Sequence, residues 1–75
     1  MKTVQISLNS IDKVKSFVND ITKFDYDVDL VSGRYVIDAK SIMGIFSLDL
    51  SKPITLEVYS DECDDLMNDI KPFMA

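Results

Sequence analysis

The order of apolar and polar positions divides the first part of the chain into two elements. Val4, Ile6 and Leu8 alternate with polar residues, a period of two that predicts a half-buried β-strand. From there the spacing lengthens to three and four, which predicts an amphipathic helix from about Ser10 to Lys23 with polar residues on its outer side. The apolar stripe of this helix consists of Ile11, Val14, Phe17, Val18 and Ile21.

The period returns to two in the next segment, which predicts a β-hairpin. One strand would run through Phe24, Tyr26, Val28 and Leu30, in alternation with three aspartates. Ser32-Gly33 is a tight-turn signal, and the strand after it would run from Arg34 to Ala39. The residues expected on one face of this second strand are Tyr35, Ile37 and Ala39.

The remaining residues predict a short helix, a strand and a final helix. Lys40 to Leu48 is largely apolar, Ser41 can cap its start, and Gly44 limits the helix to one or two turns. After a turn at Ser51-Lys52-Pro53, the segment Ile54–Val58 alternates as a fourth strand. Ser60 or Asp61 would cap the last helix, which Pro72 weakens near its end. Its buried stripe would be Cys63, Leu66, Met67, Ile70 and either Phe73 or Met74.

This β-α-β-β-α-β-α order indicates an α+β fold, and 75 residues fit one domain that spans positions 1–75. We expect one antiparallel sheet with the helices on one face and solvent on the other, because so few helices cannot cover both faces. The residues expected in the core are Val14, Phe17, Val18, Ile21, Val28, Leu30, Leu56, Val58, Leu66 and Ile70.

Composition and charge narrow the function classes. A net charge of -5 disfavours nucleic acids and anionic membrane surfaces as partners, and no apolar run is long enough to span a bilayer. The N-terminus has no signal-peptide core, and a lone Cys63 points to a reducing, cytoplasmic location. No nucleophile–base pair or metal cluster is visible, so we expect neither an enzyme nor a cofactor. Two groups of acidic residues are interpreted without a metal. The first, a solvated strand face, is Asp25, Asp27 and Asp29, and the second, a helix N-terminus, is Asp61, Glu62, Asp64 and Asp65. Cys63 is interpreted as a small apolar core residue.

One segment carries a family resemblance. Lys40-Ser41-Ile42-Met43-Gly44-Ile45-Phe46-Ser47-Leu48 resembles the regulatory-serine segment of Gram-positive HPr, the histidine-containing phosphocarrier of the bacterial sugar phosphotransferase system. The stretch from Lys23 to Leu30 resembles the strand that precedes it, and the similarity extends without a gap from about Lys23 to Val58. The resemblance implies an open-faced β-sandwich with sheet order 1-4-2-3.

The resemblance also implies two functional features in this segment. Ser41 would be a phosphorylation site for HPr kinase/phosphorylase, although a serine here also has the ordinary role of a helix cap worth about 1 kcal/mol. The two roles are compatible, because a phosphate is favoured at a helix N-terminus. The matching residues of HPr form an apolar patch that docks partner proteins, and here we expect Ile42 and Leu48 to be more buried than Met43 and Phe46. The docking residues implied in this way are Lys40, Ile42, Met43, Phe46 and Leu48.

The front of the chain departs from the family pattern. HPr has a His-Ala-Arg-Pro sequence at the start of its first helix, and the corresponding positions here are Ser10 for histidine, Asp12 for arginine and Lys13 for proline. The sequence contains no histidine at all. Ser10 cannot form a phosphoramidate, and Asp12 would repel a phosphate at short range. We therefore expect no histidine phosphotransfer.

Three functions follow from these observations. The first is a monomeric, non-catalytic regulatory or adaptor protein that presents the Ser41 helix to a protein partner, such as HPr kinase/phosphorylase or a transcriptional regulator. The second is a phosphocarrier with a non-histidine acceptor, for which Ser10 is the nearby hydroxyl. The third is an evolutionary relic whose fold persists without a partner.

Overall fold

A computed structural model describes residues 1–75, and the elements follow one another in the predicted order β-α-β-β-α-β-α. A single 3₁₀ turn, η1, follows the last helix. The elements are β1 (Lys2–Ile6), α1 (Ile11–Ile21), β2 (Val28–Ser32), β3 (Tyr35–Asp38), α2 (Ile42–Phe46), β4 (Ile54–Val58), α3 (Asp64–Asp69) and η1 (Lys71–Phe73).

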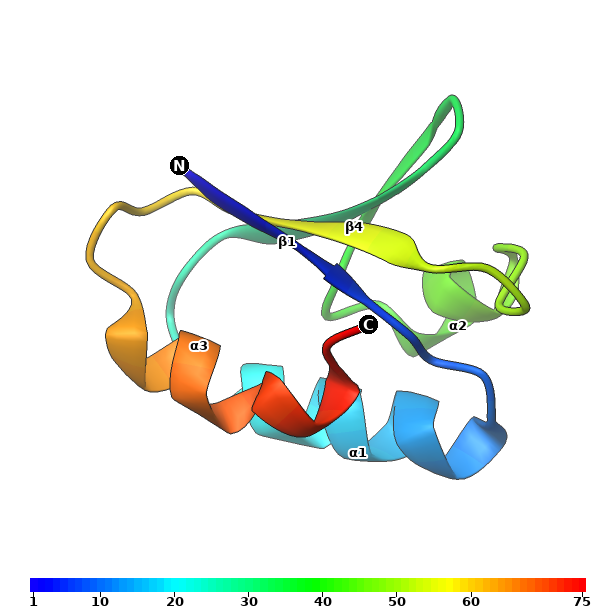
Figure 1. Cartoon of the computed structure of the whole chain (residues 1–75), viewed down its shortest axis with the longest axis horizontal. Coiled ribbons are helices and arrows are strands. Elements are labelled where there is room, and N and C mark those ends of the chain that lie inside the picture. Colours follow the sequence, from blue (N-terminus) through cyan, green and yellow to red (C-terminus); the bar gives the residue numbers. More distant parts are fainter.

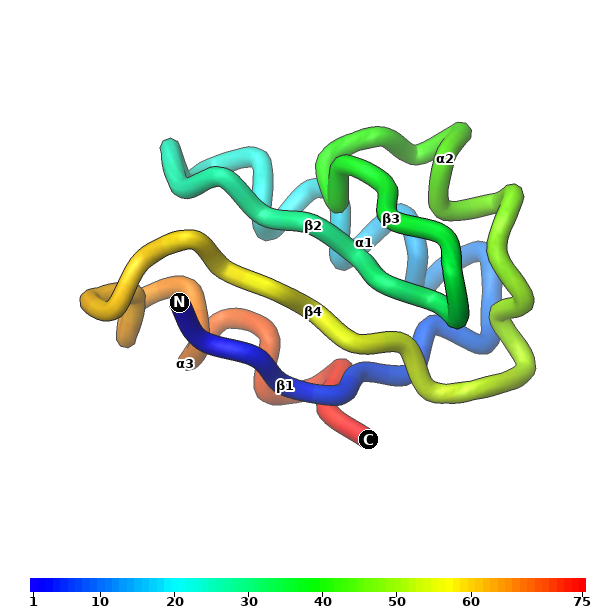
Figure 2. Tube along the Cα trace, turned by 90° about the horizontal axis from the view of Figure 1, so that it is seen from above, coloured from blue at the N-terminus to red at the C-terminus, as the bar shows by residue number.

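The four strands form one antiparallel sheet in the order β1-β4-β2-β3, which confirms the expected α+β fold. Val4, Leu56, Leu30 and Ile37 lie opposite one another across the four strands, so a row of apolar side chains crosses the whole sheet. Helices α1 and α3 cover this face, and α2 lies at one end of the sheet (Figure 1). Seen from above, no helix covers the opposite face (Figure 2).

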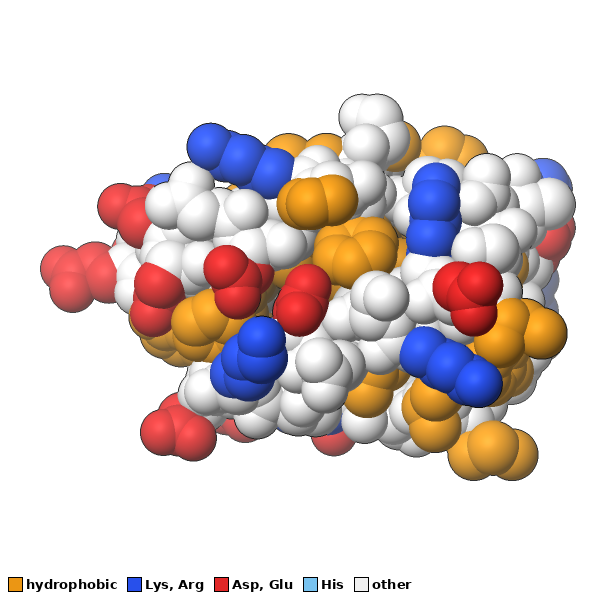
Figure 3. Space-filling model, turned by 90° about the horizontal axis from the view of Figure 1, so that it is seen from below, with side chains coloured by type: hydrophobic (Ala, Val, Ile, Leu, Met, Phe, Trp, Pro, Cys, Tyr) orange, Lys and Arg blue, Asp and Glu red, His pale blue; other side chains and the backbone are white.

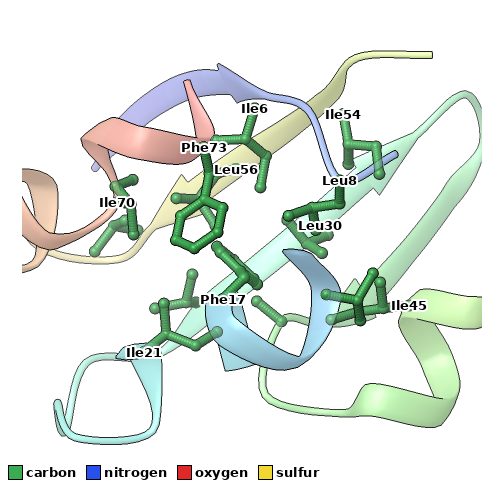
Figure 4. Packing of buried hydrophobic residues seen from close by; sticks show 14 of the residues in the cluster. Ile6, Leu8, Phe17, Ile21, Leu30, Ile45, Ile54, Leu56, Ile70 and Phe73 are labelled. Carbon is green, nitrogen blue, oxygen red and sulfur yellow. The ribbon is translucent and has the colours of Figure 1, made fainter. Parts of the chain in front are cut away.

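The core consists of apolar side chains only, and no polar or charged residue is buried. Phe17 of α1 lies near its middle, and its ring meets that of Phe73 from η1 edge to face at 5.6 Å and 85° (Figure 4). Of the ten residues predicted for the core, nine are buried, and Val18 is half-buried. Cys63 is also fully buried, as its apolar interpretation predicted.

Helix α1 shows why one residue of the predicted apolar stripe is not buried. Ile11 belongs to the apolar stripe by spacing, but its side chain is 62% exposed. Ile11 is the first helical residue, and this turn lies beyond the end of the β1 arrow, so no strand covers it (Figure 1). Val14, one turn later, is fully buried against the sheet.

The alternation that starts at Phe24 does not form a strand until Val28. Register explains this difference, because Val28 lies opposite Val58, the last residue of β4, and earlier residues have no strand to pair with. Phe24 instead stacks on Tyr26 at 6.1 Å, and the Tyr26 hydroxyl donates to the Glu62 carbonyl at 3.0 Å. Asp29 alone of the three aspartates therefore lies on the strand.

The hairpin turn is as predicted, with Gly33 at a φ of 60° and a two-residue loop between Ser32 and Tyr35. A positive φ at the first loop residue alone is the pattern of a type II′ turn. Tyr35 was expected on the same face as Ile37 and Ala39, but it is largely exposed because it sits at the tip of the edge strand.

The last helix starts later than predicted. Ser60 does not cap it, since its hydroxyl accepts from the Glu62 amide at 3.2 Å within the preceding turn, and α3 begins only after Cys63. Phe73 completes the buried stripe, whereas Met74 is exposed and pairs with Ile6 at the sheet edge. The Ser7 amide donates to the Phe73 carbonyl at 2.7 Å, so the end of the chain covers the edge of β1. No helix has the length and apolar character needed to cross a membrane.

Candidate functional site

The candidate site is centred on α2 and on Ser41, which precedes it. The Ser41 hydroxyl accepts a hydrogen bond from the Gly44 amide at 3.2 Å, and the Ser41 carbonyl accepts from the Ile45 amide at 3.1 Å. Ser41 is therefore the N-cap of α2, as predicted, and its side chain is exposed. The hydroxyl is both a structural cap and accessible to another protein.

Gly44 allows α2 to approach the sheet edge closely. A Cβ atom at this position would lie 3.3 Å from Ile37 Cδ1 on β3 and 3.3 Å from Ser41 Oγ. Both distances are shorter than ordinary van der Waals contact. The glycine thus permits the cap and the helix–strand contact to exist together.

The exposed side of α2 is apolar. Met43 is 77% exposed and Phe46 is 41% exposed, while Ile42 is half-buried and Leu48 is buried at 8%. This matches the order of burial that the sequence predicted. Leu48 thus supports α2 from within the core and cannot contribute much to a docking surface.

Ile11 adds a residue that the docking prediction did not include. Helices α1 and α2 pack against each other, and the exposed Ile11 begins α1 at the same end of the molecule. Hydrophobic side chains gather at this right-hand end when the protein is seen from below (Figure 3). We call the exposed residues Ile11, Met43 and Phe46 the α2 apolar surface. Only the packing of α1 against α2, which sequence spacing does not show, places the start of α1 at the same end of the molecule as α2.

Lys40 does not hold its charge free beside Ser41. Its ammonium donates to the Phe24 carbonyl at 2.7 Å, and its amide donates to Asp38 Oδ1 at 2.9 Å. The residue is half-buried. The positive charge of Lys40 is therefore engaged by the backbone of another segment.

The start of α1 is capped by Ser10. The Ser10 hydroxyl accepts from the Lys13 amide at 3.2 Å, which makes Ser10 the N-cap. Asp12 is exposed in the first turn, and no cation lies within salt-bridge distance of it. The helix N-terminus thus already carries a carboxylate. Its charge opposes any second anion that approaches.

No group of three or more cysteine, aspartate or glutamate side chains is arranged to hold a metal ion. Asp25, Asp27 and Asp29 form no such group, and only Asp29 belongs to β2.

Solved structures with the same fold are phosphocarrier proteins. HPr-C-His from Thermoanaerobacter tengcongensis superposes with a TM-score of 0.78 at 26% identity, over 93% of this chain and 86% of that one. HPr from Bacillus anthracis superposes with a TM-score of 0.73 at 25% identity, over 99% and 94% of the two chains. The histidine-containing phosphocarrier protein of Mycoplasma gives 0.71 at 17% identity over 95% and 86%, which supports the fold alone.

Sequence comparison leads to the same family. No curated protein sequence matches the chain. The family described as the PTS HPr component phosphorylation site matches residues 13–75, and this match begins after Ser10 and Asp12. The matched region holds the complete sheet except β1, all of α2, and α3. Because the match covers most of the chain, and the strand order and helices agree, this protein belongs to the HPr family of the phosphotransferase system.

Proposed function

We propose that this HPr-family protein has lost histidine phosphotransfer and acts in the cytoplasm as a non-catalytic adaptor, presenting α2 to a partner protein. The observation that carries this proposal is the start of α1. Ser10 caps the helix and Asp12 occupies its first turn, at the positions where the resemblance places histidine and arginine.

The chemistry of these replacements supports the loss of activity. A phosphoryl group on histidine is bound to a ring nitrogen, and the chain has no histidine to supply one. An arginine near the site would pair with the phosphoryl oxygens, whereas the Asp12 carboxylate repels them. Ser10 offers a hydroxyl, but the Asp12 carboxylate in the same first turn opposes a phosphoryl group on it.

The α2 apolar surface supports the adaptor role. Methionine and aromatic residues are enriched at the centres of protein interfaces, and Met43 and Phe46 are exposed side by side on one short helix. Ile11 widens the same surface from α1. A partner that covers Met43 completely would gain about 1.5–3 kcal/mol from that side chain.

Ser41 gives this surface a means of control. Its hydroxyl is exposed, it lies two residues from Met43, and the surrounding segment resembles the family's kinase substrate. A phosphate there would add a charge of about -1.5 to -2 at the border of the apolar surface. Partners that tolerate an anion would be favoured over partners that require a neutral surface.

A phosphorylation experiment tests both parts of the proposal. One sample receives phosphoenolpyruvate and enzyme I, the other receives ATP and HPr kinase/phosphorylase, and intact-mass spectrometry counts the phosphates. We expect none in the first sample and one in the second, which peptide mapping assigns to Ser41. Ser41→Ala should abolish the modification, whereas Ser10→Ala should not change it.

The results have separate consequences. A phosphate in the enzyme I sample would contradict the loss of carrier activity. Phosphate on Ser47 or Ser51 would contradict the assignment to Ser41. The absence of phosphate on every residue would contradict the proposed control by phosphorylation.

A matched pair of variants tests the surface itself. Met43→Gln should lower kcat/KM for the kinase by about tenfold, since about 1.4 kcal/mol of apolar burial is lost. Val36→Gln changes another exposed apolar residue, on β3 (60% exposed against 77% for Met43), and should stay within twofold. Equal effects from both variants would show that the kinase does not use α2 for docking.

A further inference from the structure

The uncovered face of the sheet contains a groove next to the β2–β3 hairpin. Its floor is formed by Gln5, Thr55 and Val31, which lie opposite one another on β1, β4 and β2. The hairpin tip forms one wall and the segment between α2 and β4 forms the other, and both flank the start of β4 in Figure 2. We call this hollow of about 590 Å³ the hairpin groove. Its size is in the range of small-molecule sites.

The two walls carry positive charge in a chain whose net charge is -5. Arg34 lies at the hairpin tip, where Gly33 turns the chain, and Lys52 lies on the facing wall. No carboxylate is within salt-bridge distance of the Arg34 guanidinium. An arginine without a partner in an acidic protein keeps its five N–H donors for a ligand.

Asp49, the acid that lines the groove, is engaged by its neighbours. Its Oδ1 accepts from the Ser51 amide at 3.1 Å and from the Ser51 hydroxyl at 2.5 Å, and its Oδ2 lies 3.8 Å from Lys52 Nζ. The hydrogen bonds from Ser51 lower the pKa of Asp49 below its usual value. With Arg34 and Lys52 against Asp49, the lining keeps one net positive charge.

We propose that the hairpin groove binds a polar small molecule through its phosphate monoester group. Arg34 and Lys52 both line the groove, and a guanidinium fork together with an ammonium is a suitable pair of donors for a phosphate. Thr55, Ser32 and Gln5 supply neutral hydrogen-bonding groups for the rest of the ligand. None of Ile11, Met43 and Phe46 lines the groove, so binding there does not require the proposed docking function.

A row of acids at the other end of the same face restricts where an anion can bind. Asp38, Asp29 and Glu57 lie directly opposite one another on β3, β2 and β4. This row is two residues along the strands from the groove floor, which is about 7 Å. At that distance each carboxylate weakens the binding of an anion about two- to threefold in water. Glu57→Gln should therefore raise the affinity by that factor.

The test is an amide NMR titration of the intact protein with glycerol 3-phosphate, inorganic phosphate and glycerol. We expect saturable shifts at Gly33, Arg34, Lys52 and Thr55 with glycerol 3-phosphate, weaker ones with inorganic phosphate, and none with glycerol. Arg34→Gln and Lys52→Gln should each weaken binding at least tenfold. Lys71→Gln removes the same charge from an exposed lysine outside the groove, and it should change the affinity less than twofold.

Several outcomes would overturn this proposal. An equal loss in Lys71→Gln would show a general charge effect instead of a site. Shifts centred on Ser10 or Ser41 would place the anion at a helix start. Equal affinity for inorganic phosphate would overturn the monoester assignment, and the absence of saturable shifts would overturn the site as a whole.

Discussion

Replacement of Phe17 by alanine tests the description of the core most directly. Phe17 has no exposed surface, and its ring packs edge to face on Phe73. A buried Phe→Ala change costs about 3–5 kcal/mol, which includes the cavity that remains. A domain of 75 residues has a stability of about 4–11 kcal/mol. The variant should therefore lose about a quarter of its stability or more.

The assay is urea unfolding followed by circular dichroism, with thermal melting as a second measurement. A loss of 3 kcal/mol should lower Tm by at least about 12 °C in a domain of this size. Phe46→Ala is the matched control, since the same atoms are removed from a side chain that is 41% exposed, and we expect a cost below about 1 kcal/mol. A cost under about 1 kcal/mol for Phe17→Ala, or equal costs for the two variants, would refute this account of the core.

Three further predictions concern single contacts, and urea unfolding measures each of them. Gly33→Ala should cost about 1–2 kcal/mol of stability, because φ is 60° and no atom lies within 4 Å of the added Cβ. Gly33→Asn should cost less, since asparagine adopts a positive φ more readily than alanine. Equal costs for the two variants would contradict a purely backbone origin. Ser10→Ala should cost about 1 kcal/mol through the lost cap of α1, and Ser10→Asp should restore it. The lowered pKa of Asp49 means that its ionised form stabilises the fold above its ordinary pKa of 3.8, and that this contribution is lost as pH falls through the lower folded value. The difference in unfolding free energy between wild type and Asp49→Asn should accordingly be larger at pH 6 than at pH 2.5, and a difference that grows toward acid would show the opposite sign.

The fold was predictable because local patterns and pairing agree along most of the chain. Two patterns each indicate a single buried face. They are the alternation in Ile54–Val58 and the spacing of Val14, Phe17 and Ile21. Where the prediction was wrong, the cause was not local. Phe24 and Tyr26 alternate like a strand, but β4 ends at Val58 and leaves them unpaired.

The candidate site was predictable to a smaller extent. Spacing identified Ser41 as a cap and ranked Met43 above Leu48 in exposure, since both depend on the helix itself. The engagement of Lys40 by the Phe24 carbonyl depends on how two distant segments meet. The hairpin groove also depends on how distant segments meet, because its floor comes from three strands that are neighbours only in the folded sheet.

The position of β1 beside β4 has a consequence for how the protein is made. The strand that is synthesised first has its partner at residues 54–58, so at about 5–20 residues per second it waits for several seconds. During that interval the apolar residues Val4, Ile6 and Leu8 have no sheet to join, and this is when the nascent chain is most exposed to aggregation. The closing contact comes later still, when the Phe73 carbonyl reaches the Ser7 amide. The N-terminal strand therefore completes its hydrogen bonds only when the last residues of the domain are available.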